Sequence, residues 1–544
     1  MSSDARADGG RRKIRWWWVI YGATMLLFVL AFSRFYLPGK GFTYVINFGS
    51  RLENRSLSKL HKLDYFVLRH SDGYDAQYYA QIALDPSLQN TQLPAAVDNL
   101  PYRARRILFS ATAYVLGLGQ PDWILQAYAL QNGLAWLVLA VVLLWWFPAT
   151  NWQNFVRWFG VLFSLGMCIS VRNALLDGPS LLLLAGGVLL AEKGRGWMSA
   201  LILAISGLGK ETNLLGAACL APPRIGDARA WGSSVLRGLL VAAPLVAWLL
   251  YLYGRFGDYT VAGSRNLSLP LVAYAQEWRV AWPALVNHEL YPLVSFAFPL
   301  ANVLLLVALT IQFLFLVLRP QWREAWWRVG ITFAILMVFL GEAVWEGAPS
   351  AAARVLLPLQ LAFNVLVPRG RWWVPVLLLG NLTVVAGPAI LEPLVSEGFE
   401  FRGATSLREN AAGKSVVVEF DDNWYDVERD GFNYWLWASG DSTLRLRNPH
   451  ARPLEAQLKF SLTPNGARTV MVRLNGVEVW RTTLAATDSI SANLRDLAFQ
   501  PGDNTIEFAT NEPATRVGSD PRPLAFNLSN LRIELLGVKG APPP

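Results

Sequence analysis

The sequence predicts a polytopic α-helical membrane protein of about eleven spans, followed by an all-β sandwich domain. Of its 544 residues, 53% are hydrophobic and only 16% are charged, whereas soluble domains carry about 25% charged residues. Apolar runs recur through residues 16–392. From about Lys414, apolar and polar residues alternate with period two, which is the pattern of strands.

The first predicted span begins at Trp16, directly after the basic residues of segment 11–15. Its apolar run is longer than the core of a cleaved signal peptide, so residues 1–15 are expected to be a cytoplasmic N-terminus. Runs of about 20 apolar residues match the hydrocarbon core of a bilayer. The other expected spans centre on Ala135, Phe163, Leu183, Leu203, Ala217, Ala242, Leu306, Ile335, Leu361 and Leu378.

The charge of the connecting loops predicts how the chain is oriented. Short basic connectors alternate along the chain with more acidic segments, and basic loops face the cytoplasm in multi-pass proteins. With the N-terminus inside, an odd number of spans places everything after Leu391 outside. The first outer loop is then residues 38–122, the longest loop within the bundle.

The predicted β domain covers residues 414–538. Asn475-Gly476 lies between two alternating segments, and this dipeptide favours the positive φ angles of a two-residue hairpin. Short strands at this spacing indicate a sandwich. Further strands are expected at 443–447, 455–462, 504–508 and 531–536.

Composition excludes several classes of function. The only two cysteines, Cys168 and Cys219, lie in apolar segments, so we expect no disulfide framework and no Cys/His metal site. The net charge is +9 and the isoelectric point is about 9.5. Because the basic residues lie in short loops between spans, the positive-inside rule explains this charge and no nucleic-acid partner is expected.

An acidic and aromatic cluster, Asp72-Gly73-Tyr74-Asp75-Ala76-Gln77-Tyr78-Tyr79, lies in the first outer loop. If the segment is helical, Asp72 and Asp75 are three apart and share one face. A carboxylate that is partly desolvated at the membrane surface gains basicity and can take a proton from a hydroxyl. The alternative is an acid-rich helix cap in a solvated loop.

Further ionisable residues map to the same outer side of the predicted bundle. Charged residues near membrane depth are candidates for function, and arginine suits bidentate binding of phosphate. Snorkelling side chains and topology signals are the alternative explanation. The residues concerned are Arg103, Arg106, Arg172, Asp177, Lys210, Glu211 and Arg354.

The chain resembles the GT-C class of glycosyltransferases that use polyprenyl-phosphate sugars, which includes the protein O-mannosyltransferases and aminoarabinose transferases. The resemblance covers roughly residues 10–390 and places the protein in a bacterial inner membrane with its C-terminal domain periplasmic. The segment from Gly73 to Tyr79 is similar to the Tyr-Asp-Gly-Gln-Phe-Tyr pattern of bacterial relatives, with Ala76 where they often have Gly. The other similar pieces are Tyr102-Arg103-Ala104-Arg105-Arg106-Ile107-Leu108, Leu176-Asp177-Gly178-Pro179 and Lys210-Glu211-Thr212.

The resemblance implies an inverting transferase that moves a sugar from a polyprenyl-phosphate donor to a glycan, lipid or protein acceptor. One carboxylate serves as the base, either Asp75 with Asp72 in support or the reverse. No cofactor is required, although a divalent cation stays an open alternative. The implied phosphate ligands are Arg354, Lys210, Arg103 and Arg106. The implied substrate contacts are Tyr78, Gln77, Arg172, Asp177 and Glu211.

Three other functions compete with this interpretation: a transporter or flippase for lipid-linked glycans, an O-antigen-type polymerase or ligase, and a scaffold for polysaccharide secretion. The predicted sandwich resembles carbohydrate-binding modules. Its aromatic residues either stack on sugars or pack in the core, as strand aromatics commonly do. These residues are Trp424, Tyr425, Trp435 and Trp437.

Overall fold

The computed structural model divides the chain into two compact units. The helical unit comprises residues 1–291 and 296–393, and the two-sheet unit comprises residues 292–295 and 394–544. The structure describes residues 4–37, 39–68, 71–224, 226–257, 264–286, 297–346, 350–393, 398–430, 433–486, 488–516, 520 and 522–539.

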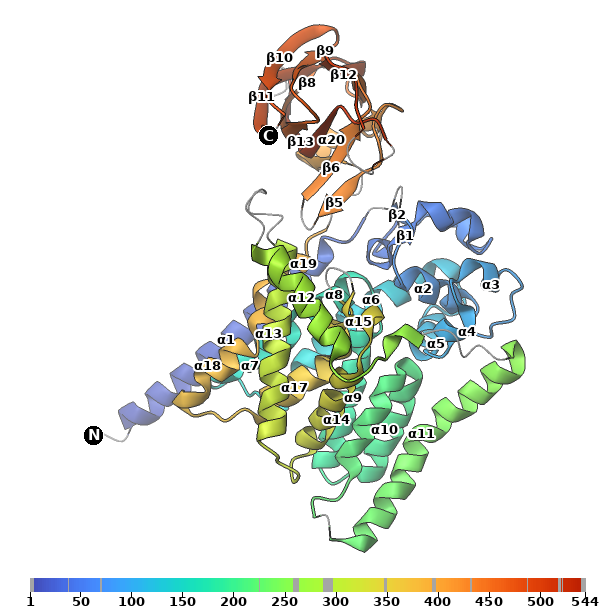
Figure 1. Ribbon diagram of the computed structural model, residues 1–544, viewed down its shortest axis with the longest axis vertical. Coiled ribbons are helices and arrows are strands. Elements are labelled where there is room, and N and C mark those ends of the chain that lie inside the picture. The colour runs from blue at the N-terminus through green and yellow to red at the C-terminus, as the bar shows by residue number, and fades with distance from the viewer. Residues whose placement is uncertain are drawn as a thin grey trace. The chain divides into compact units, whose positions relative to one another are not determined.

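The helical unit contains long helices interspersed with short ones (Figure 1). The α-helices of its first half are α1 (Asp4–Ser33), α2 (Ala76–Leu84), α3 (Leu93–Ala96), α4 (Leu100–Ala104), α5 (Leu108–Leu116), α6 (Pro121–Val142), α7 (Trp152–Leu162), α8 (Leu165–Arg172) and α9 (Asp177–Glu192). Those of its second half are α10 (Gly196–Gly209), α11 (Ala228–Phe256), α12 (Val272–Val286), α13 (Ala297–Leu318), α14 (Ala325–Phe339), α15 (Glu342–Trp345), α16 (Ala352–Val355), α17 (Leu357–Leu366), α18 (Val374–Leu379) and α19 (Gly387–Ile390).

The prediction of a helical unit with several helices that could span a membrane is confirmed, but the predicted number of about eleven spans is not. Among the described residues, four helices are long and apolar enough to cross a membrane: Trp16–Ser33, Pro121–Trp145, Ala228–Phe256 and Pro299–Leu318. A fifth is obtained if α7 and α8, which meet at a 45° bend, form one span. The other predicted spans fall on shorter elements. For example, α17 has 10 residues, about half of what a straight crossing needs.

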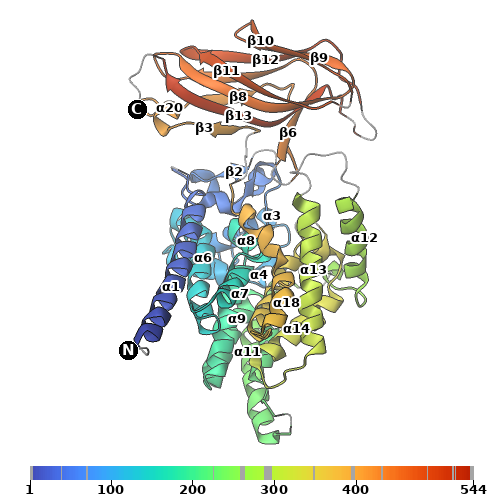
Figure 2. The same ribbon diagram turned by 90° about the vertical axis from the view of Figure 1, so that its left-hand side faces the viewer.

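The predicted β-rich region is confirmed, and its strands form two sheets (Figure 2). The five-stranded sheet has the order β10-β9-β12-β7-β4, and the six-stranded sheet has the order β11-β8-β13-β6-β5, with β3 added beside β13. The strands of the first sheet are β4 (Val417–Phe420), β7 (Ser442–Asn448), β9 (Arg468–Leu474), β10 (Val477–Leu484) and β12 (Gly502–Thr510). Those of the second are β3 (Glu400–Arg402), β5 (Glu428–Asp430), β6 (Asn433–Ala438), β8 (Leu454–Pro464), β11 (Ile490–Phe499) and β13 (Phe526–Val538).

Alternation along the strands builds one apolar core between these two sheets. Strand β8 alternates strictly between buried and more exposed side chains, as a strand with one buried face does. Phe460 from one sheet contacts Phe508 from the other, with ring centroids 5.6 Å apart. The turn between β9 and β10 has φ angles of 50° at Asn475 and 82° at Gly476, so it has the positive φ angles expected of this hairpin.

Candidate functional site

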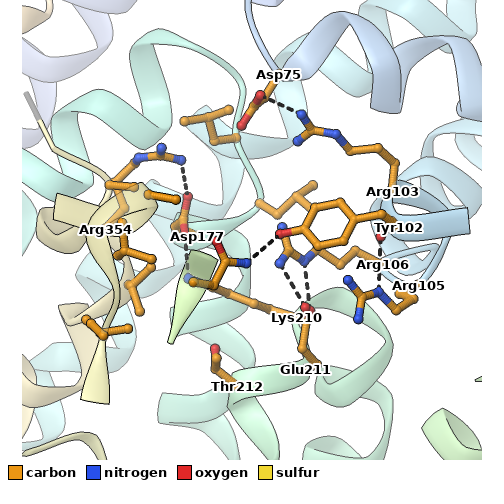
Figure 3. A pocket seen from close by; sticks show the side chains of 18 of the residues that line it. Asp75, Tyr102, Arg103, Arg105, Arg106, Asp177, Lys210, Glu211, Thr212 and Arg354 are labelled. Atoms are coloured by element: carbon orange, nitrogen blue, oxygen red, sulfur yellow. Dashed lines mark hydrogen bonds and ion pairs between the residues drawn. The ribbon is translucent and has the colours of Figure 1, made fainter. Parts of the chain in front are cut away.

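A polar cavity of about 480 Å³ lies within the helical unit. Its lining contains five basic side chains, Arg103, Arg105, Arg106, Lys210 and Arg354, and three acidic ones, Asp75, Asp177 and Glu211. Figure 3 shows these side chains pointing toward one another from segments far apart in the sequence. The cavity thus brings together seven of the residues singled out in the sequence, with a surplus of positive charge.

The loop that leads to Asp75 is held by a close crossing of two backbone segments. A Cβ atom on Gly49 would lie 2.2 Å from Gly73 N, so no side chain fits there. Gly73 itself has a φ of +74°, which favours glycine. Gln77 then fixes the crossing: its Oε1 accepts from Gly49 N (3.1 Å) and its Nε2 donates to Asp72 O (2.6 Å).

The expectation that Asp72 and Asp75 lie on one helix is wrong. Helix α2 begins at Ala76, Asp75 is its N-cap residue, and Asp72 lies before the turn at Gly73. The side chain of Asp72 is 70% exposed and lies 3.6 Å from Arg51. The positive φ of Gly73 breaks the helical path, so the two carboxylates do not share a face.

Asp75 is held by Arg103 at the edge of the cavity. Arg103 Nη2 donates to Asp75 Oδ1 (2.9 Å), and the same guanidinium donates to both carboxylate oxygens of Asp98 (3.0 and 2.7 Å). Burial opposes the charge of Arg103, but the hydrogen bond to Asp98 and the nearby Asp75 raise its pKa above the ordinary value. Among the described residues, Asp75 Oδ2 has no hydrogen-bond partner. This oxygen can therefore accept a proton from a ligand.

A second pair joins Arg106 to Glu211. Arg106 Nε and Nη2 donate to the two carboxylate oxygens of Glu211 (2.7 and 2.8 Å), a bidentate geometry. Arg106 Nη1 also donates to Tyr79 OH (3.2 Å). Burial opposes ionisation of Glu211, but the charge and hydrogen bonds of Arg106 dominate and lower its pKa to about 2.

Three buried charges of the cavity meet at Asp177, the first residue of α9. Lys210 Nζ donates to Asp177 Oδ1 (2.5 Å), and Arg354 Nη1 donates to Oδ2 (3.2 Å). Figure 3 shows Asp177 between the two cations. The exposed fractions of the Asp177, Lys210 and Arg354 side chains are 8%, 9% and 12%. Two cations beside one carboxylate leave positive charge available for an anionic ligand.

Arg105 differs from the other basic residues of the lining. Within the described part of the chain it forms no ion pair; its Nε donates to Tyr102 O (3.3 Å), and its guanidinium lies 4.4 Å from the centroid of the Tyr102 ring. Tyr102 OH in turn accepts from Asn266 Nδ2 (3.2 Å). The stacked ring holds a cation at the cavity while leaving its outer N–H groups for a ligand.

Most of the remaining lining is apolar and comes largely from the second half of the helical unit. Gly341 N donates to Asn266 O (2.8 Å), which joins the segment before α12 to the end of α14. The apolar lining residues are Leu175, Leu176, Leu267, Leu336, Leu340, Ala343, Val344, Ala351 and Val355. A ligand that carries both negative charge and hydrocarbon matches this lining.

Four of the predicted site residues do not line the cavity. Asp72 is exposed, and Gln77 holds the loop, as described above. The Tyr78 ring lies 5.1 Å from the Arg103 guanidinium, so it contacts a lining residue from outside the cavity. Arg172 is buried elsewhere, where it donates to Asn47 Oδ1 and Tyr44 OH at 3.4 Å each.

Several lining residues had no role assigned from the sequence. Tyr79, Tyr102, Arg105 and Thr212 belong to the short motifs already quoted, so their motif membership was the available signal. Asn266 carries no such signal, because its segment reaches the cavity only through tertiary packing. Thr212 Oγ1 is buried without a hydrogen-bond partner in the described structure.

Within the described residues, no group of three or more His, Cys, Asp or Glu side chains is arranged to hold a metal ion. Each acidic residue of the cavity contacts at least one basic side chain: Asp75 with Arg103, Glu211 with Arg106, and Asp177 with Lys210 and Arg354.

No family model and no curated protein sequence matches the chain. Similarity to solved structures is slight. A family two carbohydrate esterase from Clostridium thermocellum, in complex with cellohexaose, has a TM-score of 0.16 and 9% identity over 24% of this chain and 34% of its own. A GH26-CBM35 β-(1,4)-mannanase from Podospora anserina has a TM-score of 0.14 and 16% identity over 23% of this chain and 26% of its own. The chain thus spans about a third or less of either protein's length.

Proposed function

We propose that the protein is a GT-C-type glycosyltransferase that transfers a sugar from a polyprenyl-phosphate donor to a glycan, lipid or protein acceptor. The observation that carries the proposal is the cavity itself. A partly exposed carboxylate, Asp75, faces a cluster of basic side chains, and hydrocarbon side chains complete the wall. This combination fits a lipid phosphate more closely than a free sugar or a peptide.

In the proposed reaction, an acceptor hydroxyl attacks the anomeric carbon of the donor sugar. The new C–O bond forms as the bond between that carbon and the phosphate oxygen breaks. Asp75 takes the hydroxyl proton through the oxygen that Arg103 does not contact. The leaving group is a phosphate anion, so a second carboxylate acting as general acid is not needed, unlike in most glycosidases. Direct displacement inverts the anomeric configuration.

Four basic side chains stabilise the departing phosphate in this proposal. Arg354 and Lys210 share Asp177, while Arg106 is held by Glu211 and Arg105 by the Tyr102 ring. Donors fixed in advance where negative charge develops stabilise a transition state without reorganising. Arg103 instead positions Asp75, because its guanidinium is already bound to two carboxylates.

Transfer of a radiolabelled sugar from a purified polyprenyl-phosphate donor by the detergent-solubilised protein tests the proposal. Wild type should form product, and Asp75→Asn should form it about 10²–10⁴ times more slowly. Asp72→Asn is the matched control, since Asp72 is exposed outside the cavity and should retain activity. Flipping of labelled lipid in proteoliposomes without transfer would favour a transporter instead. Elongation of a lipid-linked glycan would favour a polymerase or ligase.

The proposed location is a bacterial inner membrane, with the N-terminus cytoplasmic and the two-sheet unit periplasmic. Single cysteines at Arg195, between α9 and α10, and at the exposed Val477 test this orientation. The two native cysteines are buried, so they should label weakly. In intact spheroplasts, Val477→Cys should react with an impermeant maleimide and Arg195→Cys should not. The opposite pattern would reverse the orientation.

A further inference from the structure

The outer face of the six-stranded sheet bears aromatic side chains that do not belong to the core. On β6, Tyr434, Leu436 and Ala438 are buried, whereas Trp435 and Trp437 alternate with them and are partly exposed. Successive side chains of a strand point to opposite faces, so both indoles lie on the outer face. They are two residues apart, about 7 Å along the strand.

Trp424 gives the contrasting case among the aromatic residues of this unit. It is 7% exposed, its Nε1 donates to Thr443 O (3.2 Å), and its ring packs edge-on against Phe508 and Phe526. Trp424 is therefore a core residue. The exposure of Trp435 and Trp437 is then not explained by packing between the sheets.

One indole is oriented by a chain of polar contacts. Trp435 Nε1 donates to Glu428 Oε2 (3.0 Å) on the neighbouring strand β5. Arg522 Nη2 lies 2.7 Å from Glu428 Oε1, and its guanidinium lies 5.1 Å from the centroid of the Tyr425 ring. Arg522 also pairs with Asp520. Each of these charged groups is thus paired with an opposite charge, and the two carboxylates outnumber the one guanidinium, which disfavours an anionic partner.

Hydroxyl and amide groups continue the face across the next strands. Trp437 pairs with Asn527 of β13, which pairs with Thr463 of β8. Trp435 pairs in the same way with Ser529, and Ser529 with Ser461. Ser529 Oγ donates to Asn527 Oδ1 (2.9 Å), which leaves the Asn527 NH₂ group as a donor. Among the described residues the Trp437 Nε1–H has no partner.

The outer face of the five-stranded sheet is built differently. Its side chains include the ion pairs Arg447–Asp503 and Arg473–Glu507, at 2.6 and 3.2 Å. Such a face is typical of a solvated surface. The outer face of the six-stranded sheet also carries an ion pair, Lys459–Glu534 at 3.0 Å, so the feature that distinguishes it is the pair of partly exposed indoles on β6.

We propose that the outer face of the six-stranded sheet binds a neutral polysaccharide chain that runs along β6, beside the polar side chains of β13 and β8. Indole faces pack against the C–H faces of sugar rings, because an aromatic ring contributes large apolar area with a fixed geometry. The Ser, Thr and Asn side chains beside them supply the donors and acceptors that sugar hydroxyls need. The two indoles lie about 7 Å apart along β6, so each can contact one of two neighbouring sugar rings of the same polysaccharide. This inference does not depend on the reaction proposed for the cavity.

Biolayer interferometry with the full-length protein in nanodiscs tests the proposal against immobilised dextran, mannan, xylan and galactan, with alginate as an acidic comparator. Wild type should bind at least one neutral polysaccharide. Trp437→Ala should weaken that binding about tenfold, and Trp435→Ala with Trp437→Ala should abolish it. Trp372→Ala is the matched control, because Trp372 is 78% exposed in the helical unit.

Two further variants keep the test decisive if loss of an indole lowers the melting temperature. Trp437→Phe keeps an aromatic face and should retain most of the binding, whereas Asn527→Ala removes only polar groups and should weaken it severalfold. No binding to any neutral polysaccharide, or equal binding by wild type and the double variant, would overturn the proposal. Binding of alginate alone, lost in high salt, would also overturn it and indicate a charged ligand.

Discussion

The helical unit and the two-sheet unit place their charged residues in opposite ways. In the helical unit, ionisable side chains from five segments converge on one cavity, and Asp177, Lys210 and Arg103 are among its buried residues. In the described part of the two-sheet unit, Arg468 is the only buried charged residue, and it donates to backbone carbonyls. Buried charge is costly unless it is paired. Three arginines buried outside the cavity donate to carbonyls or neutral side chains, namely Arg157, Arg172 and Arg328, so the paired acids and bases of the cavity mark the candidate site.

For aromatic residues, unlike charged ones, partial exposure rather than burial distinguishes the informative side chains. Tryptophan is common in both units and carries little information in the helical one, where membrane interfaces favour it. On a sheet with a complete apolar core, two indoles on the outer face are unusual. A buried, paired charge in one unit and a partly exposed ring on the outer face of a sheet in the other are thus both informative. The following predictions test this contrast, from the largest expected effect to the smallest.

Asp75→Asn should lower the rate of sugar transfer by about 10²–10⁴-fold, the range expected for loss of a general base. The substitution keeps the shape of the side chain and removes its basicity. Transfer is measured at saturating donor, so that a change in affinity does not contribute. Full activity in Asp75→Asn together with inactivity of Asp72→Asn would move the base to the exposed acid.

Asp177→Asn should destabilise the helical unit by about 3–5 kcal/mol, because it leaves Lys210 and Arg354 buried without their partner. The matched change in the two-sheet unit is Asp503→Asn, whose carboxylate is 71% exposed in its pair with Arg447. Exposed pairs contribute little, so this variant should melt like wild type. Thermal unfolding of both proteins in the same detergent measures the difference. Equal melting temperatures would show that burial does not set the strength of these pairs.

Arg105→Ala should raise the KM for the donor about tenfold or more, as loss of a hydrogen bond to a charged group does. Because Arg105 has no carboxylate partner in the described structure, its removal leaves no acid unpaired. The expected change is therefore in donor binding, with little change in melting temperature. Arg371→Ala is the control: Arg371 stacks on Trp372 outside the cavity. A similar KM for both variants would exclude Arg105 from donor binding.

Acid should weaken the helical unit partly through Glu211. Its pKa is lowered to about 2 in the folded protein, so the unfolded chain takes up the proton first as the pH falls. The stabilisation is complete above the ordinary glutamate pKa and is lost between there and about pH 2. Glu211→Gln should therefore flatten the fall in melting temperature below pH 4.5. Glu478→Gln, in an exposed pair on β10, should leave the profile unchanged.

The two units also differ in how far the sequence predicts them. Period-two alternation and Asn475-Gly476 were sufficient to predict a β-rich region with the observed hairpin, because these signals are local. The number of membrane spans was not predictable to the same degree. Segments such as 196–209 are apolar enough, but their helices are short, and the bend between α7 and α8 depends on packing.

The candidate site was predictable as a set of residues but not as a geometry. The expected sidedness of Lys210, Glu211 and Arg354 grouped them with the acidic loop, and all three line one cavity. Residues predicted to lie on the same side of the membrane need not lie close to one another. Arg172 was therefore among the predicted site residues, although it is buried beside Tyr44 and outside the cavity. The partner that each cation selects, such as Arg106 with Glu211, depends on tertiary contacts that no local pattern encodes.

The crossing at Gly49 and Gly73 has a consequence for deep mutational scanning of this protein. Any side chain at either position collides with backbone atoms, so nearly every substitution should inactivate the protein at the level of folding. Sensitivity scores along the segment around Asp75 would then peak at positions that never touch a substrate. Cell-surface or membrane abundance, read in parallel with activity, would separate this steric requirement from chemistry.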